Sequence, residues 1–167
     1  MKKFTAILIL AASMLFVFTA CGGDGNEPYL ANDGILHQFH NLGFSLVFPD
    51  SWDGKYGLFG HEFEAEDGLR RFLTIYHKAT REALGSEYVG TLFWLGVVPG
   101  EHYTDDEPPV MAGATIILAQ TGGHTYFLNF PSDVQWDYQN PDSEAATEFL
   151  EMSGQYRFIV DNFRIIE

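Results

Sequence analysis

The chain has 167 residues, of which 46% are hydrophobic and 16% aromatic, so it can bury one real core and is short for two domains. Nine basic residues against 23 acidic ones give a formal net charge of −14, which argues against nucleic acid as a partner because phosphates would be repelled. Cys21 is the single cysteine, so no intramolecular disulfide can form and packing must stabilise the fold.

The first twenty residues have the pattern of an export signal. Lys2 and Lys3 precede a continuous apolar run from Phe4 to Ala20. A stable membrane span needs about 20 apolar residues and often a positive flank, and this run is shorter and is followed by glycines and acids. We therefore expect residues 1–20 to be a cleaved signal peptide.

Thr19 and Ala20, directly before Cys21, resemble the lipobox of bacterial lipoproteins, although Phe18 stands where an aliphatic residue is usual. The resemblance implies that the Cys21 sulfur carries diacylglycerol and that the chain is anchored on the extracytoplasmic face of the cell membrane. Each buried methylene contributes about 0.8 kcal/mol, so two or three acyl chains hold firmly where one does not. A plain secretory signal with a chance cysteine, or an uncleaved anchor, is the alternative.

The segment after the lipobox is rich in glycine, asparagine, aspartate and proline. Such a composition buries little, so residues 21–34 are expected to form a flexible tether. One folded domain is expected over residues 35–167. All acidic residues follow position 20, and an acidic surface favours solubility of an exported domain.

Short aromatic and β-branched runs separated by turn residues indicate strands in the first part of this domain. Phe44–Phe48 is the first run, and Asp67-Gly68 separates 61–66 from 70–77 as a hairpin. A two-residue turn would place Glu64 opposite Arg71. A three-residue loop would place Phe63 opposite Leu73, and we favour it because it gathers Phe63, Leu73 and Ile75 on one face.

The middle of the domain continues this pattern around one short helix. Lys78–Leu84 is expected to be helical and closed by Gly85, and Thr91–Val98 to be a strand before an acidic loop at 101–109. A second hairpin is predicted from 114–121 and 124–130 around Gly122-Gly123. Its two-residue turn would place Ala119 opposite Tyr126 and Ile117 opposite Leu128.

The last segment changes to helical spacing. From Asp142 onward, apolar and small residues recur every three or four positions, namely Ala146, Phe149, Leu150, Ser153, Tyr156, Val160 and Phe163. Pro141 would stand at an early helical position, and a kink or break could occur at Gly154. Strands followed by a long helix predict an α+β fold, with an antiparallel sheet of about six strands and the C-terminal helix and short helices packed on it.

Several short motifs resemble small lipoproteins of anaerobic Gram-positive bacteria. They are residues 43–52 (GFSLVFPDSW), 54–56 (GKY), 76–79 (YHKA), 125–127 (TYF), 131–135 (PSDVQ), 151–152 (EM) and 162–163 (NF). That family is similar in architecture to PsbP-like and Ran-interacting Mog-type proteins, which have an antiparallel sheet flanked by helices and are binding or assembly factors. The resemblance implies a PsbP-like α+β domain, but no functional residue carries over, because what matches is a hydrophobic pattern.

Catalytic and metal motifs are weak. His61-Glu62-Phe63-Glu64-Ala65 has Ala65 where a zinc protease needs its second histidine. Glu62, Glu64 and Glu66 alternate and could hold calcium, but a row of this kind is more often a solvated face. The acidic residues 105–107 could likewise hold calcium but are more often solvated. The histidines 37, 40, 77, 102 and 124 are scattered along the sequence, so no metal site is assigned to them. We assign no catalytic residue, metal ligand or cofactor, and neither a nucleophile elbow nor a phosphate-binding loop occurs.

Aromatic residues outside the strand centres give the one positive indication of binding. Trp136, Asp137 and Tyr138 lie in a polar loop, and Trp52 and Tyr56 lie at strand ends, so these five are the candidate binding residues. The competing interpretation of Trp52 and Trp94 is that they fill the core. We expect a lipid-anchored, non-enzymatic binding or accessory module that contacts an envelope protein or a small ligand. A lipid-anchored hydrolase with an unrecognised carboxylate site and a cation-binding protein are the alternatives.

Overall fold

The computed structural model describes residues 29–31, 34–104, 106–110 and 113–166. Residues 1–28, and with them the predicted signal peptide and Cys21, lie outside the described part of the chain. In chain order, the elements are β1 (Tyr29–Ala31), β2 (Gly34–Phe39), β3 (Phe44–Phe48), the 3₁₀ helix η1 (Asp50–Trp52), β4 (Tyr56–Ala65), β5 (Gly68–His77), α1 (Lys78–Leu84), β6 (Thr91–Pro99), β7 (Thr115–Thr121), β8 (His124–Asn129), α2 (Glu144–Gly154), α3 (Tyr156–Asp161) and β9 (Arg164–Ile165).

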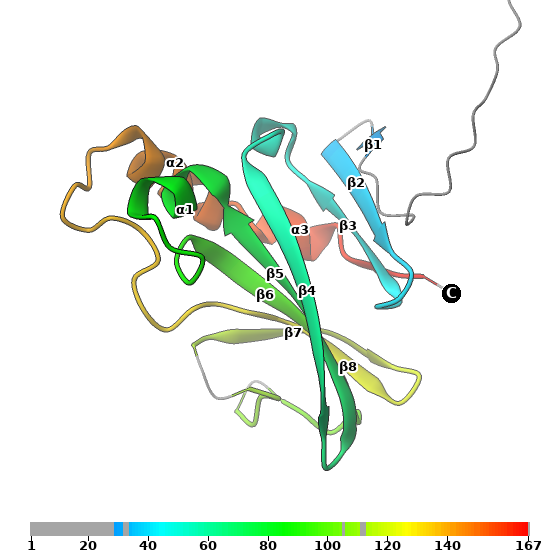
Figure 1. The fold of residues 1–167 in the computed structure, drawn as a ribbon. Helices are drawn as coiled ribbons and strands as arrows, with labels where there is room; N and C mark the ends of the chain where they lie inside the picture. The colour runs from blue at the N-terminus through cyan, green and yellow to red at the C-terminus, as the bar shows by residue number, and fades with distance from the viewer. Residues whose placement is uncertain (1–28, 32–33, 105, 111–112, 167) are drawn as a thin grey trace, which may run out of the picture.

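The strands form two antiparallel sheets, as Figure 1 shows. The smaller sheet has the order β1-β2-β3-β9, and the larger one has the order β4-β5-β6-β8-β7. The predicted α+β class is therefore confirmed, but the expectation of a single sheet of about six strands is wrong. The chain leaves the first sheet at Pro49-Asp50, and η1 redirects it into β4, which pairs with β5 and not with β3.

The first sheet begins earlier than the sequence suggests. Residues 29–31 form β1 and pair with β2, so Tyr29 stands opposite Leu36 and Ala31 opposite Gly34. Four residues of the segment expected to be a tether, 29–31 and Gly34, therefore belong to the sheet. β3 has the predicted bounds, since four of its five residues are aromatic or aliphatic and only Val47 is not buried.

The β4–β5 hairpin differs from both predicted registers. Ala65 pairs with Gly68, so Glu66 and Asp67 form the turn, and Glu62 stands opposite Arg71. Gly68 supplies the positive φ of 120° that the tight connection requires, and it stands after the two turn residues rather than among them. As a result, Phe63 lies opposite Arg70, on the face away from Leu73, and the favoured grouping of Phe63 with Leu73 and Ile75 is wrong.

The β7–β8 hairpin confirms half of its predicted register. Gly122 and Gly123 both have positive φ, which is the conformation of a type I′ turn, and Ala119 stands opposite Tyr126. The register then shifts between Ile117 and Ala119, so Ile117 stands opposite Phe127 and not opposite Leu128. This bulge adds one residue to β7, which a sequence pattern alone does not reveal.

The C-terminal helical segment is broken into α2 and α3 at Gln155, directly after Gly154. Ser143 is the N-cap of α2, and its side chain accepts a hydrogen bond from the Ala146 amide, so Pro141 precedes the helix instead of starting it. The buried stripe contains Ala146, Phe149, Met152, Ile159 and Phe163. The predicted stripe thus misses Met152 and Ile159 and includes Leu150, which is exposed.

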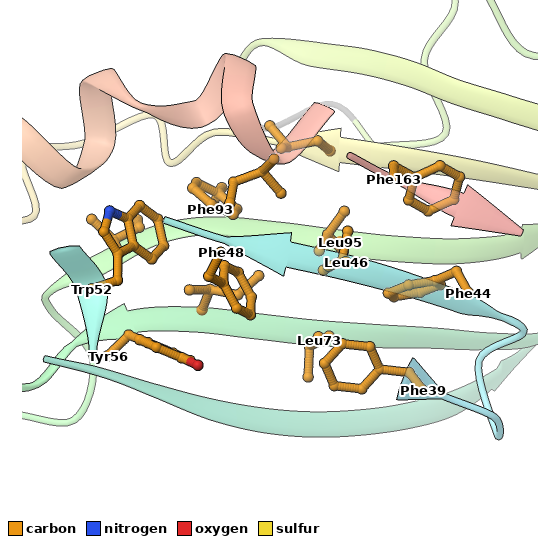
Figure 2. Close-up of a cluster of buried hydrophobic side chains, with 14 of the residues drawn as sticks. Phe39, Phe44, Leu46, Phe48, Trp52, Tyr56, Leu73, Phe93, Leu95 and Phe163 are labelled. Atoms are coloured by element: carbon orange, nitrogen blue, oxygen red, sulfur yellow. The ribbon is translucent and has the colours of Figure 1, made fainter. Parts of the chain in front are cut away.

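The core lies between the inner face of the five-stranded sheet, the first sheet and the C-terminal helices. Figure 2 shows these side chains gathered between β3 and the strands of the larger sheet. Trp52, Phe48 and Phe93 have no exposed surface, and Phe44 and Phe163 close the other end of the cluster. α1 has the predicted bounds, with Gly85 in the left-handed region. Within the described residues, no helix combines the length and apolar character that crossing a bilayer requires.

Candidate functional site

Two of the five candidate binding residues belong to the core. The Trp52 ring has no exposed surface and stacks on Phe48 at 5.5 Å, and its Nε1 donates a hydrogen bond to Gln155 Oε1 over 2.6 Å. Tyr56 is buried, and its hydroxyl lies 2.5 Å from His37 Nε2. Burial, with a smaller effect of Asp53, raises the pKa of Tyr56 to about 12. Trp52 and Tyr56 therefore stabilise the fold and are not available to a ligand.

The other three candidates are not brought together. Trp136 is half-buried and lines a shallow hollow of about 440 Å³ beside α2. Asp137 lines a different hollow of about 220 Å³, and its carboxylate accepts a hydrogen bond from the Gln139 amide. Only Tyr138 is largely exposed, at 66%. The loop therefore offers single side chains and not a shared binding surface.

The acidic row on β4 is solvated. Glu62 and Glu64 are exposed on one face of the strand, and Glu66 lies in the turn. The Arg71 Nε lies 3.6 Å from a Glu62 carboxylate oxygen. Among the described residues, no group of three or more histidine, cysteine, aspartate or glutamate side chains could hold a metal ion.

A three-residue hydrogen-bonded network joins α1, α2 and the end of β5. His77 is fully buried, with Nδ1 2.8 Å from Thr80 Oγ1 and Nε2 2.7 Å from Glu148 Oε2. The other Glu148 oxygen lies 2.8 Å from Lys55 Nζ, and these two partners lower the pKa of Glu148. The order hydroxyl, imidazole, carboxylate is that of a nucleophilic triad. However, Thr80 is 2% exposed, so a substrate carbonyl cannot approach its oxygen and the network holds the helices in place.

The outer face of the five-stranded sheet is only partly covered: Tyr103, Val110 and Ile117 pack against Phe72, Val98 and Phe127, whereas Phe59 and Phe63 remain exposed. Adjacent strands place their outward side chains in transverse rows, because paired residues in a sheet point to the same side. One row contains Phe59, Thr74, Trp94, Asn129 and Thr115. The next row contains His61, Phe72, Gly96, Phe127 and Ile117.

The rings of these rows stack along β4 and β5. His61 lies between Phe59 and Phe72, with ring centroids 6.0 Å and 5.2 Å away, and Phe63 stacks on Phe72 at 5.6 Å. Phe59 is 59% exposed and Phe63 48% exposed. The stack therefore continues from a buried ring, Phe72, to rings that remain open to solvent.

Two hollows lie on this face, and both are lined by His61 and Trp94. One has a volume of about 370 Å³, and its lining is Phe59, His61, Thr74, Arg81, Glu87, Tyr88, Thr91 and Trp94. The other has a volume of about 290 Å³, and its lining is His61, Phe72, Trp94, Val110 and Asn129. We call the two together the outer groove. Their size falls in or near the range of small-ligand sites, and apolar rings with a few polar groups are the usual lining of such sites.

The polar side of the outer groove comes from the segment between α1 and β6. Arg81 lies 3.5 Å above the Tyr76 ring and donates through Nε to the Val89 carbonyl oxygen. Burial lowers the pKa of Arg81, although Tyr76 and Glu87 oppose the shift. Tyr88, at 83% exposure, stands at the rim. The groove can therefore accept an apolar or aromatic group on its floor and hydrogen bonds at its edge.

Gly96 allows the Phe127 ring to pack directly against the backbone of β6 on this face. A Cβ atom at this position would lie 2.1 Å from Cζ of Phe127, so the ring occupies the space that a side chain would fill. Phe127 is fully buried and meets Phe72 edge-on at 6.0 Å. Glycine is thus required for a close approach between the strand and the ring.

A further hollow, of about 580 Å³, borders β4 on the opposite face. It lies between the β2–β3 turn and the β4–β5 hairpin, and is lined by Phe39, Asn41, Leu42, Leu58, Gly60, His61, Glu62, Arg71, Phe72 and Leu73. We call it the turn cleft. The outer groove and the turn cleft both reach His61, so β4 has a hollow on each side.

No protein-family model, curated protein or solved structure matches this chain. The outer groove therefore has to be judged by its own geometry. The candidate binding residues predicted from the sequence do not include its lining, although the alternation of Phe59, His61 and Phe63 along one strand is a signal of an aromatic face. The remaining lining residues come from β5, β6 and the α1–β6 segment, and only the strand registers bring them together.

Proposed function

We propose that the protein is a lipid-anchored, extracytoplasmic, non-enzymatic binding module of the cell envelope, and that it binds its partner through the outer groove. The observation that carries the binding role is the aromatic stack that remains exposed at Phe59 and Phe63, of which Phe59 lines the outer groove together with Trp94. Exposed aromatic clusters of this kind are typical of recognition surfaces. The resemblance to PsbP-like binding and assembly factors supports the same role.

The alternatives receive less support. A carboxylate hydrolase needs an acid whose pKa is raised by burial, whereas the described carboxyl groups with a clear shift, Asp67 and Glu148, have lowered pKa values. Their cationic neighbours Arg70 and Lys55 are the largest cause in each case. A cation-binding role would rest on Glu62, Glu64 and Glu66, which are exposed and gather no further ligand from the described residues.

Site-specific crosslinking on intact cells tests the binding role. A photoreactive amino acid replaces Tyr88 at the rim of the outer groove or, as the matched control, Tyr138, another exposed tyrosine that lies off the groove. We expect a discrete crosslinked partner from position 88 and none from position 138. Crosslinking at 138 alone would move the binding surface to the loop at 136–138, and crosslinking at neither position would remove the proposed role.

The anchor is tested separately at Cys21. We expect the native protein to incorporate an alkyne-labelled fatty acid and to begin at residue 21, because the lipobox resemblance implies acylation of Cys21 and cleavage before it. Cys21→Ser should abolish the label and release the protein from the membrane fraction. An intact mass that contains an unmodified thiol or residues 1–20 would contradict the anchor, whatever the crosslinking shows.

A further inference from the structure

The four sheet edges of the described structure differ in how they are protected. β1 and β9 have three and two residues, which is too short to template another strand. β7 contains the bulge between Ile117 and Ala119, and a bulge interrupts regular pairing. β4, in contrast, has ten residues in continuous register with β5. It contains no proline, no lysine and no bulge, and the charged residues that protect this edge are two glutamates, Glu62 and Glu64.

The free side of β4 is open over most of its length. At its start, Tyr56 contacts His37 of β2 through a hydrogen bond. From residue 57 to residue 65, no backbone hydrogen bond to a described residue other than those of β5 occurs. Residues 59–64 are exposed, and a Cβ on Gly60 would meet only the Phe72 carbonyl oxygen, at 3.9 Å. Figure 1 shows this part of β4 and β5 as a long arm that continues beyond the ends of β2 and β3.

We propose that β4 pairs with an extended segment of a partner protein in which basic and apolar residues alternate. Strand addition uses backbone hydrogen bonds for affinity and side-chain hollows on both faces for specificity. β4 has such hollows on each side, namely the outer groove and the turn cleft. This inference rests on the proposed binding function and names the class of partner.

The alternation of basic and apolar residues in the partner follows from the different side chains on the two faces of β4. One face presents Phe59, His61 and Phe63, which suit apolar or aromatic side chains. The other presents Glu62 and Glu64, and of these two only Glu62 forms an ion pair with a described residue, Arg71, at 3.6 Å. Lysine or arginine opposite these carboxylates satisfies them, whereas a like charge directly opposite destabilises a strand pair.

Charge also disfavours a second copy of this chain as the occupant. Two β4 strands in antiparallel contact would bring the same acidic rows together, and each chain carries a net charge of −14. A basic segment is attracted by the negative electrostatic potential of the chain, which speeds its association and orients it. A homodimer formed through β4 would therefore contradict the proposal, and the experiment below can detect it.

The test uses the protein purified from membranes in detergent and a synthetic ten-residue peptide of alternating lysine and valine, with its ends blocked. Fluorescence anisotropy of the labelled peptide measures the dissociation constant. N-methylation of every second residue removes those backbone donors and leaves the charge unchanged. We expect one set of N-methylated positions to weaken binding about tenfold or more, and the intervening set to change it less than about twofold. Equal binding by both sets would show attraction by charge alone and overturn strand pairing.

Protein variants test the acidic face. Glu64→Lys should weaken the lysine peptide about fivefold and strengthen a glutamate peptide of the same length. Glu82→Lys, an equal change at an exposed position of α1, should alter binding less than about twofold. The proposal would be overturned if the two variants changed binding equally, or if the lysine peptide did not bind. It would also be overturned if sedimentation showed a dimer whose formation Glu64→Lys alters. If position 88 still crosslinks to a partner in that case, the proposed binding function stands and only the strand-pairing inference is lost.

Discussion

The two faces of the five-stranded sheet contain similar side chains in different environments. On the inner face, Phe93 and Leu95 are covered by the first sheet and by α2 and α3. On the outer face, Phe59 and Phe63 remain about half exposed, although they stack on other rings. Most phenylalanines of the described residues are buried or partly buried, whereas Phe59 and Phe63 remain open to solvent, and exposed rings of this kind are typical of surfaces that contact another molecule.

The largest expected difference between the faces is in stability. Phe48→Ala removes a ring with no exposed surface from the inner core and should lower the free energy of unfolding by about 3–5 kcal/mol. Phe59→Ala makes the same chemical change on the outer face and should cost less than about 1 kcal/mol. Urea unfolding of both variants measures the difference. Equal losses would mean that the outer face is as firmly packed as the inner one and would contradict its role as an open surface.

Lowering the pH should destabilise the folded protein through protonation of His37, which lies in the core. This side chain is 3% exposed, Nδ1 has no hydrogen-bond partner among the described residues, and burial lowers the pKa of His37 from 6.5 to about 4. Since the unfolded chain binds the proton more readily, stability falls as the pH decreases from 6.5 to 4, by roughly 3 kcal/mol in total. Unfolding measured from pH 7.5 to 4.5 checks this.

His37→Leu is the control for that experiment. It removes the partner of the Tyr56 hydroxyl, so it should cost a constant amount of free energy at every pH. The difference in stability between the native protein and the variant should shrink as the pH falls through this range. A difference that stays constant would assign the acid sensitivity to other groups, such as Glu148.

Gly96→Ala tests how the packing beneath the outer face affects stability and binding. The new methyl group cannot fit beneath the Phe127 ring, so the ring must move and the variant should lose about 1–3 kcal/mol. The displaced ring should also disturb Phe72 and reduce binding in the outer groove. Gly122→Ala, where a Cβ would contact nothing, tests only backbone strain in a turn and should leave binding unchanged. Intact binding in Gly96→Ala would show that this floor does not shape the groove.

A smaller effect than at Phe48 is expected at Glu148, which joins α2 to α1 and the end of β5. Glu148→Gln loses the attraction to Lys55 but can still accept a hydrogen bond from His77, so it should cost less than about 1 kcal/mol. Glu148→Ala leaves the buried His77 Nε2 without its partner and should cost about 1–3 kcal/mol. Thermal unfolding of the two variants separates charge from hydrogen bonding, and equal losses would assign the whole effect to the ion pair.

Local chemistry predicted most elements but not their arrangement. β3 and α1 have the expected bounds, because an aromatic run before Pro49 and a glycine at position 85 define them within a few residues. The registers were less accessible, since the extra residue near Leu118 and the two-residue turn before Gly68 change which side chains share a face. The division into two sheets depends on long-range pairing, which hydrophobic periodicity does not encode.

The candidate site was harder to predict for the same reason. Trp52 and Tyr56 stand beside turns, and the sequence shows that position but not the core that closes over them. Tyr138 is as exposed as a polar loop suggests, yet its neighbours Trp136 and Asp137 line separate hollows. The outer groove combines β4, β5, β6 and the α1–β6 segment, so it exists only once the strands are in register.

The position of β1 limits how far the protein can rise above a bilayer. Tyr29 is already paired with Leu36, so with the proposed lipid on Cys21 only eight peptide links separate the membrane surface from the first sheet. Fully stretched, these links span roughly 28 Å, compared with roughly 45 Å if the leash continued to Gly34. The start of the first sheet therefore stays within that height of the lipid headgroups, and any greater reach must come from the dimensions of the folded domain itself.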